Sequence, residues 1–200
     1  MTACCPVVEL RQYTLKPGQR DVLIALFEAR FVESQEACGM TLIGQFRDLD
    51  DPDRFVWLRG FPDMESRARA LAAFYGGPVW KAHREAANAT MIDSGNVLLL
   101  RPGRGFDLAP RGGARPSGTL FAHVCRSDAA FAARFARDLA PHLDPLAWLV
   151  TEPARNTFPA LPVREGENVL VWFGRSGPPS ETGRPVESLR LEPTARSRLR

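Results

Sequence analysis

Residues 7–18 read VVELRQYTLKPG and alternate as a β-strand does. Because successive side chains of a strand point to opposite faces, Glu9, Arg11 and Tyr13 share one face, each about 7 Å from the next. The other face is largely apolar and suits a packed helix layer; it carries Val8, Leu10, Gln12 and Thr14. This row combines an acid, a guanidinium and a phenol on a strand that we expect to be central. It is therefore the first candidate for a ligand-binding site.

The composition is that of a globular protein with a mildly basic charge. The 200 residues are 44% hydrophobic and 24% charged, with a net charge of +3. This is enough for one large domain or two small ones. Lys16 and Lys81 are the only lysines, so arginine supplies nearly all of the basic charge, as in bacterial-type, GC-rich compositions. The arginines are scattered and do not form a patch, which argues against a nucleic-acid partner.

The cysteines and the hydropathy predict a cytoplasmic protein with no membrane partner. None of the four cysteines (Cys4, Cys5, Cys38 and Cys125) belongs to a C-x-x-C pair, so we expect free thiols in a reducing compartment. The N-terminus has no basic region followed by an apolar run. No segment approaches the roughly 18 apolar residues of a membrane span.

Periodicity predicts a β-α-β-β-α-β order in the first half. After the turn at 16–18, apolar residues at helical spacing indicate a helix over 19–37, and a hairpin follows at 41–48 and 54–61. Phe55, Trp57, Arg59 and Phe61 share one face of the second hairpin strand. Helices are predicted at 63–75 and 78–89, and a strand at 96–101. This order is that of the ferredoxin-like split unit.

The second half repeats this order imperfectly after a Gly-, Pro- and Arg-rich linker. The predicted divisions are a domain at 1–103, a linker at 104–117 and a degenerate second unit at 118–200. Predicted strands lie at 118–126, 145–151, 168–175 and 187–191, with a helix at 128–143. The segment 177–185 is too rich in Gly and Pro for a full second helix. We therefore expect an α+β fold of two ferredoxin-like units, the second of them degenerate.

The face that carries Tyr13, Phe55, Trp57 and Phe61 would be a large apolar patch if it were open to solvent. Two sheets meeting face to face would bury this patch, either between the halves of one chain, between two chains, or both.

Three stretches resemble the NIPSNAP family of the dimeric α/β-barrel superfamily. They are VELRQYTLKPG at 8–18, IGQFRDLDDPDRFVWLRGF at 43–61 and FYGGPVWKAHREAANATMIDSGNVLLLRP at 74–102. The resemblance is extensive over 7–102 and weak over 118–200. It implies an α/β barrel built from paired ferredoxin-like units, with a small molecule in the cavity between the sheets. It also implies a homodimer as the expected assembly. The family has no well-defined activity to carry over.

Two rows of side chains are the first candidate ligand contacts. Arg11 suits a carboxylate or enolate, because a guanidinium offers five donors and a positive charge, and Glu9 is a candidate base. The alternative for Glu9 is a structural ion pair with Arg11 or Arg59. Trp57, Arg59 and Phe61 are expected to face the same cavity and seat a flat anionic ligand, or else to be core.

The histidines give the remaining candidates. Trp80, His83 and Arg84 share one face of the predicted helix 78–89, and His83 is a candidate acid–base group or haem ligand. The alternative is an interfacial histidine packed beside Trp80. His123 lies within a predicted strand of the second half and is either a cavity-facing base or a satisfied buried histidine. No metal-binding pattern is present, and the acidic residues at 48–53 read as a solvated turn.

These features predict a small-molecule-binding barrel, and one hypothesis is that it is a cofactor-free enzyme. The expected chemistry is proton transfer or rearrangement on a small carbonyl or anionic substrate. Arg11 and Arg59 would hold the oxygen, Glu9 or His83 would move the proton, and Tyr13, Trp57 and Trp80 would shape the pocket. One alternative is a haem-binding or monooxygenase-type oxidoreductase of the same superfamily. Another is a non-catalytic interaction or scaffold protein.

Overall fold

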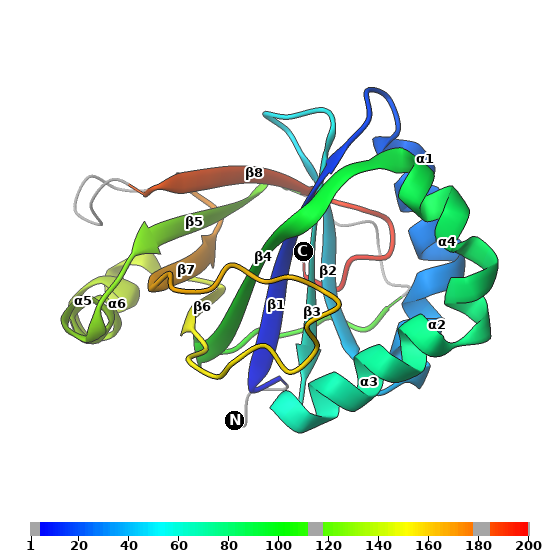
Figure 1. The fold of residues 1–200 in the computed structure, drawn as a ribbon. Coiled ribbons are helices and arrows are strands. Elements are labelled where there is room, and N and C mark those ends of the chain that lie inside the picture. The colour runs from blue at the N-terminus through cyan, green and yellow to red at the C-terminus, as the bar shows by residue number, and fades with distance from the viewer. Residues whose placement is uncertain (1–4, 112–117, 178–184, 200) are drawn as a thin grey trace.

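Eight antiparallel strands close into a barrel in the computed structural model, which describes residues 5–111, 118–177 and 185–199 (Figure 1). The strand order around the barrel is β1-β3-β2-β8-β5-β7-β6-β4. The strands are β1 (Val7–Leu15), β2 (Thr41–Asp48), β3 (Arg54–Phe61), β4 (Met91–Arg104), β5 (Leu120–Arg126), β6 (Ala147–Thr151), β7 (Val169–Gly174) and β8 (Glu187–Pro193).

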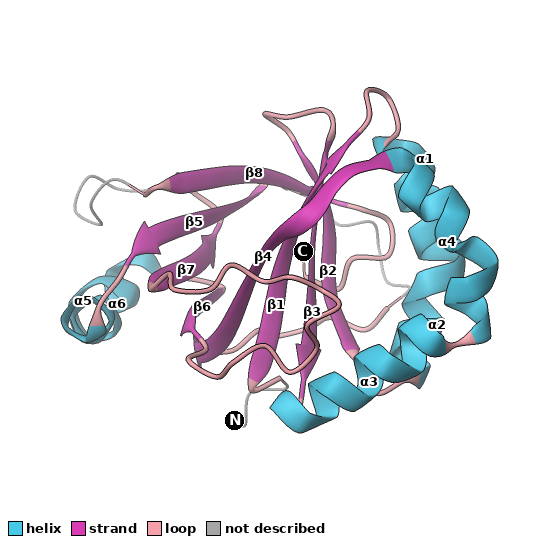
Figure 2. Ribbon diagram, viewed as in Figure 1, coloured by secondary structure: helices cyan, strands magenta, loops and turns pink. Residues whose placement is uncertain are grey.

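The helices lie outside the barrel and are concentrated beside the strands of the first half (Figure 2). This side carries α1 (Arg20–Leu26), the π-helix η1 (Phe27–Phe31), α2 (Val32–Ala37), α3 (Met64–Gly76) and α4 (Pro78–Thr90). The second half has α5 (Ala129–Arg134), the π-helix η2 (Phe135–Leu139) and α6 (Ala140–Leu143).

The barrel closes within one chain. The four first-half strands are adjacent in the order β4-β1-β3-β2, and the four second-half strands in the order β8-β5-β7-β6. The two sets join where Phe46 to Asp48 pair with Leu191 to Pro193, and where β4 pairs with β6. Closure of the barrel therefore needs no second copy of the chain.

The predicted elements agree with the observed ones to within a few residues. Predicted hairpin strands and observed β2 and β3 have the same bounds. The helix predicted at 19–37 is interrupted by η1, and the one at 128–143 by η2. The segment 177–185, where a second helix was predicted to be lost, lies mostly outside the described residues. Cys4 also lies outside them. Cys38 and Cys125 are free thiols.

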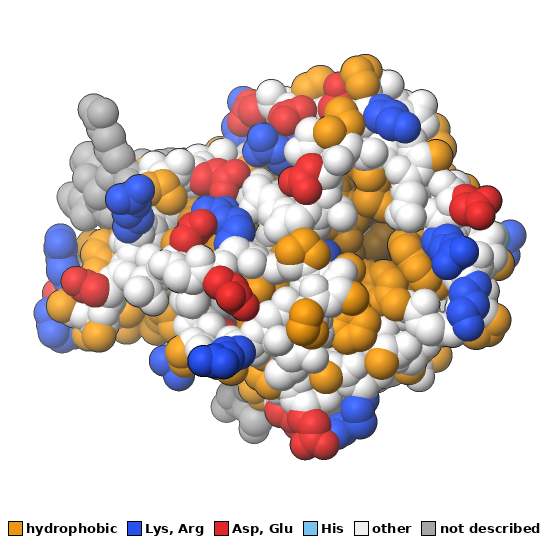
Figure 3. Space-filling view, in the orientation of Figure 1, with side chains coloured by type: hydrophobic (Ala, Val, Ile, Leu, Met, Phe, Trp, Pro, Cys, Tyr) orange, Lys and Arg blue, Asp and Glu red, His pale blue; other side chains and the backbone are white. Residues whose placement is uncertain are grey.

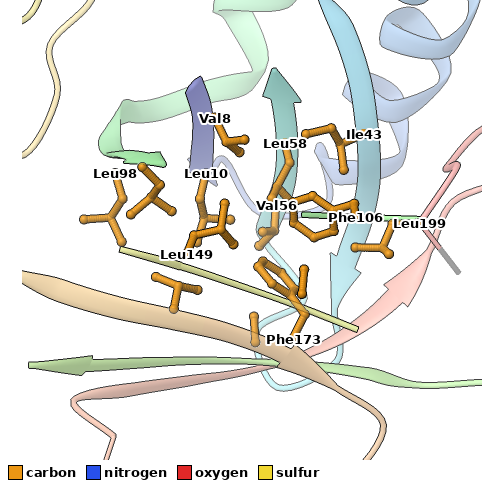
Figure 4. Close-up of a cluster of buried hydrophobic side chains, with 14 of the residues drawn as sticks. Val8, Leu10, Ile43, Val56, Leu58, Leu98, Phe106, Leu149, Phe173 and Leu199 are labelled. Atoms are coloured by element: carbon orange, nitrogen blue, oxygen red, sulfur yellow. The ribbon is translucent and has the colours of Figure 1, made fainter. Parts of the chain in front are cut away.

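Hydrophobic side chains from both halves fill the barrel interior. Val8 and Leu10 pack there with Leu149 and Phe173 of the second half, and Phe106 joins them from the segment after β4 (Figure 4). The interior is thus a packed core. Apolar burial of this kind is the main stabilising contribution to a fold of this size.

This packing corrects the predicted facing of the strands. The apolar residues of β1 point into the barrel, and the opposite row points outward to the helices. The residues expected to line a cavity between sheets are therefore covered by helices; they are Glu9, Arg11, Tyr13, Trp57, Arg59 and Phe61. The division of each strand into two faces was right, but the side assigned to each face was wrong.

Candidate functional site

One glutamate and three arginines form a buried cluster between the first-half strands and the helices. Glu9 Oε2 accepts hydrogen bonds from Arg11 Nη1 and Arg59 Nε, each at 2.7 Å. Its Oε1 accepts from Arg67 Nε at 2.6 Å. All four side chains are at most 1% exposed.

Strand register and one helix cap place these groups together. Glu9 lies directly opposite Arg59 in the β1–β3 pairing, so their side chains leave the sheet side by side. Asp63 caps α3 by accepting a hydrogen bond from the backbone N–H of Ser66. The cap sets where the helix begins, and Arg67 follows within the first turn on the face that packs on the sheet.

The electrostatics of the cluster favour an ionised, fixed glutamate. Burial by itself would raise the pKa of Glu9, but Arg59, Arg11 and Arg67 outweigh burial and hold that pKa well below its usual range. Burial lowers the pKa of Arg67, and the like charges of Arg59 and Arg11 add to that effect against the attraction of Glu9. The alternative to a catalytic Glu9 was a structural ion pair with Arg11 or Arg59. The structure contains both of these pairs.

Aromatic rings surround the cationic side chains. The Arg59 Cζ lies 5.0 Å from the Trp57 ring centroid, 5.7 Å from Phe61 and 5.9 Å from Tyr75. The Arg11 Cζ lies 5.5 Å from the rings of both Tyr13 and Trp57. Cation–π contacts of this kind help to hold guanidinium groups in an apolar layer.

A small pocket of about 30 Å³ opens beside this cluster. Figure 3 shows a hollow ringed by hydrophobic side chains on this face of the molecule. Such a volume is enough for a water molecule but not for a substrate without movement of the walls. The lining comes from β1, β3, the α1–η1–α2 helix, α3 and α4: Tyr13, Leu23, Phe27, Phe31, Gln35, Trp57, Phe74, Tyr75, Trp80, Ala87 and Met91.

Two polar side chains connect the pocket to the cluster. Gln35 Oε1 accepts from Arg59 Nη1 at 3.0 Å, and the Tyr13 hydroxyl accepts from Arg11 Nε at 3.2 Å. Burial raises the pKa of Tyr13, so its phenol stays protonated and has its own proton to donate. The pocket is therefore apolar on its helix side and bordered by hydrogen-bonded cations on its sheet side.

The π-helix η1 shapes the helix side of the pocket. Its first and last residues, Phe27 and Phe31, are both buried and both line the pocket, with ring centroids 6.0 Å apart. Residues four apart lie on the same face of the helix, so both rings point to the pocket. Single π-turns within α-helices often occur at functional sites, which makes this interruption informative.

A segment of the second half, the β6–β7 connection at 152–168, also contacts the cluster. It crosses the outer side of β4 and β1 (Figure 1), held by backbone hydrogen bonds from Glu152 to Leu99 and from Arg164 to Val97. Arg67 Nη1 donates to Asn156 Oδ1 at 3.0 Å and to Thr157 Oγ1 at 3.3 Å. Phe158 stacks on the pocket residue Tyr75, with centroids 6.1 Å apart. The two halves therefore build this region jointly.

The three predicted site residues on α4 do not lie equally close to the pocket. Trp80 lines the pocket, whereas His83 is half-buried at its edge, with its ring 6.4 Å from that of Phe31. Arg84 is exposed on α4 and takes no part in the cluster.

His123 does not join the site. It lies on β5, four strands from β1 around the barrel, and on the outer face of the sheet, so the cavity-facing position is wrong. Its Nδ1 is 2.9 Å from Ser188 Oγ and its Nε2 is 3.4 Å from the Ser176 carbonyl oxygen. Burial lowers its pKa. This geometry is that of a satisfied buried histidine.

Sequence reasoning did not find Arg67, Gln35, Tyr75 or Asn156 as site residues. Two of them carried a signal, because a polar residue at helical spacing from buried apolar ones points to the core. Arg67 is four residues before Leu71, and Gln35 is four residues after Phe31. Asn156 had no such signal, since its contact with Arg67 spans 89 residues of chain.

The described residues contain neither a group of metal ligands nor a helix suited to cross a membrane. Within 5–111, 118–177 and 185–199, no three His, Cys, Asp or Glu residues group together as a metal site would require. No helix in the same ranges is long and apolar enough to cross a membrane.

Comparison with solved structures relates the whole fold to two bacterial proteins, each provisionally named a monooxygenase. The protein from Fusobacterium nucleatum is 9% identical, with a TM-score of 0.61 and coverage of 96% of this chain and 94% of its own. The one from Lactobacillus acidophilus is 14% identical, with a TM-score of 0.57 and coverage of 94% of both chains. At these identities the likeness concerns the fold alone.

The first half has more specific relatives. A NIPSNAP-like domain protein from Burkholderia xenovorans is 26% identical over 55% of this chain and 89% of its own, with a TM-score of 0.43. No curated protein matches the sequence. The NIPSNAP family model matches residues 8–104, the span from β1 through β4 that carries the Glu9 cluster. Residues 8–104 therefore form a NIPSNAP-family domain within this chain.

Proposed function

We propose that this protein binds a small molecule in the pocket between the first-half strands and the helices. The observation that carries this proposal is the direct connection of an aromatic pocket to a buried cationic cluster through Gln35 and Tyr13. Ligand sites typically combine an apolar lining with a few convergent polar groups of this kind. The NIPSNAP-family domain and the fold shared with the monooxygenase-named proteins support a small-molecule-binding role.

The proposed chemistry is cofactor-free proton transfer or rearrangement on a small carbonyl or anionic substrate. Arg11 and Arg59 would stabilise an anionic oxygen, because both guanidinium groups border the pocket residues. Glu9 suits the role of a fixed counter-charge better than that of a base, since its depressed pKa makes it a weak proton acceptor. The protonated Tyr13 hydroxyl and the edge residue His83 are the groups placed to exchange a proton with a ligand.

The assembly belongs to the same proposal. The β4-β1-β3-β2 and β8-β5-β7-β6 orders support two ferredoxin-like units, the second of them degenerate. We also propose a homodimer in the cytoplasm, as expected from the family resemblance and the free cysteines. Because the barrel closes within one chain, such a dimer would form through outer surfaces.

The haem alternative receives no support from the pocket. A macrocycle would need far more movement of the pocket walls than a small carbonyl compound, and the His83 ring packs beside Phe31 at the pocket edge. The interaction-protein alternative remains distinct, because it predicts that changes in the pocket leave function intact.

Native mass spectrometry of the purified protein, compared with its denatured mass, tests the proposal. A defined extra mass that is lost on denaturation is expected, and Tyr13→Phe together with Trp80→Ala should reduce its occupancy. An Arg84→Ala variant is the matched control, because Arg84 is exposed on the same helix as Trp80. A ligand-free protein from several growth conditions would count against the proposal and in favour of the interaction protein.

A further inference from the structure

The charges of the Glu9 cluster do not balance. Three guanidinium groups surround one carboxylate, so the four ionised groups sum to +2. The other hydrogen-bond partners of the arginines are neutral: Tyr13, Gln35, Met40, Asn156 and Thr157. Arginine stays protonated in proteins, so the excess cannot be removed by loss of a proton. Buried charge without a counter-charge is strongly unfavourable.

Two of the arginines also have a free donor atom. Arg59 Nη2 and Arg67 Nη2 are buried and have no hydrogen-bond partner within the described part of the chain. Both side chains are 0% exposed. Their Nε atoms bind the two oxygens of the same Glu9 carboxylate, so the two guanidinium groups flank one point in the protein. A buried donor without an acceptor is costly, and native proteins rarely keep such donors.

The surroundings indicate what kind of acceptor would meet these donors. Arg59 is linked to the aromatic pocket by Gln35 and lies against the Tyr75 ring. The planar fork of a guanidinium matches the two oxygens of a carboxylate, and paired charges with hydrogen bonds are the strong form of this contact. An apolar pocket next to such donors suits a ligand with an apolar body and an anionic end.

We propose that Arg59 and Arg67 form a carboxylate-receiving subsite, and that the ligand of the neighbouring pocket is a small organic carboxylate. This inference rests on the function proposed above and names its ligand class. Arg67 is the specificity-determining residue, because it meets the first-half cluster on one side and Asn156 and Thr157 of the second half on the other. The β6–β7 connection thereby becomes part of the site, although it lies outside the NIPSNAP domain.

Matched pairs of probes test the inference in a low-chloride buffer. The pairs are acetate and acetamide, butyrate and butyramide, and benzoate and benzamide; each pair has nearly the same shape and differs in charge. Binding would be measured by calorimetry and by the shift in melting temperature, with chloride and inorganic phosphate as separate arms. The acid of at least one pair is expected to bind about tenfold or more tightly than its amide, as hydrogen bonds to a charged group imply.

The Arg67→Gln variant should remove most of this preference for the acid. Arg69→Gln is the matched control, because Arg69 lies on the same helix but is 63% exposed and pairs with Glu65. Circular dichroism and a melting curve would confirm that both variants fold. Arg67→Lys, which keeps the charge but lacks the fork, should restore the preference only in part.

The possible outcomes separate the two proposals. Equal binding of acid and amide would leave small-molecule binding intact and overturn the carboxylate subsite. Chloride or phosphate stabilising the protein as well as every carboxylate would also overturn it, by showing a general inorganic anion site. An Arg67→Gln variant that keeps the full preference would remove Arg67 from the subsite. Binding of none of these probes would reject the carboxylate class, and native mass spectrometry would then decide whether any small molecule binds.

Discussion

At the scale of single residues, the feature that organises the site is one carboxylate shared by three arginines. Glu9 accepts from Arg11, Arg59 and Arg67, and each of these contacts is buried. A buried ion pair is not in general a source of stability, because removing both charges from water offsets their attraction. Removing Glu9 alone is strongly destabilising, since it leaves three buried positive charges without a negative partner.

The Glu9→Gln substitution is accordingly expected to destabilise the protein by about 3–5 kcal/mol. The amide cannot neutralise any of the three arginines and accepts through only one oxygen. Urea unfolding followed by circular dichroism would measure the change. Glu65→Gln is the control, because Glu65 is 83% exposed and forms only a surface pair with Arg69. Similar stabilities for the two variants would show that the cluster is less tightly coupled than its geometry indicates.

The pH dependence follows from the depressed pKa of Glu9. A carboxyl group whose pKa is lower in the folded state binds fewer protons than in the unfolded state, so it contributes stability above its ordinary pKa of 4.5. That contribution is lost as the pH falls from this value toward the lower folded-state pKa. In Arg67→Gln the pKa of Glu9 is less depressed, so this variant should lose less free energy of unfolding between about pH 6 and pH 3 than the wild type. Urea unfolding across this range would measure the loss, and an unchanged profile relative to Arg69→Gln would contradict the assignment.

At the scale of elements, the site depends on pieces that periodicity alone does not bring together. Phe27 and Phe31 line the pocket from η1, the Asp63 cap sets the start of the helix that carries Arg67, and a second-half connection contacts Arg67. The connection is anchored at both ends to β4, by Glu152 and by Arg164. Its middle is therefore ordered by contacts with the site itself.

Asn156→Ala tests this connection. Asn156 accepts from Arg67 and from the Phe158 backbone N–H, and it donates to the Leu161 carbonyl oxygen. Loss of these bonds leaves Arg67 Nη1 with Thr157 alone and should destabilise the protein by about 1–3 kcal/mol. Thermal unfolding would detect the loss as a lower melting temperature. Arg155→Ala, at the exposed neighbouring position, should change it little, and equal effects of the two would argue against a specific role for Asn156.

At the scale of the whole molecule, each half provides one wall of a shared interior. Val8, Leu10, Val56 and Leu58 of the first half pack against Leu149 and Phe173 of the second. The NIPSNAP domain alone would expose this apolar sheet face to water. Exposed apolar surfaces of this extent lead to association.

A fragment of residues 1–106 is therefore expected to form dimers or larger assemblies and not a folded monomer. In a dimer, a second copy of the same sheet would replace the missing half of the barrel. Light scattering coupled to gel filtration would give the assembly state, with the full chain as the control. A monomeric fragment with cooperative thermal unfolding would contradict this reasoning, because it would show that the first sheet is stable without a covering sheet.

The sequence by itself determined the elements, their order, the two faces of each strand and the family of the first half. The elements and their faces rest on local periodicity, and β2 and β3 have the bounds that it predicts. The family rests on the stretches at 8–18, 43–61 and 74–102. Only the tertiary structure decided which face of β1 lies inside the barrel. Both faces are buried, so alternation separates them without saying which one is interior. The polar row lies beneath the helices, where three arginines hydrogen-bond Glu9. The contacts of Arg67 with Glu9 and with Asn156 join residues 58 and 89 positions apart, and contacts at such separations are set by how the barrel closes.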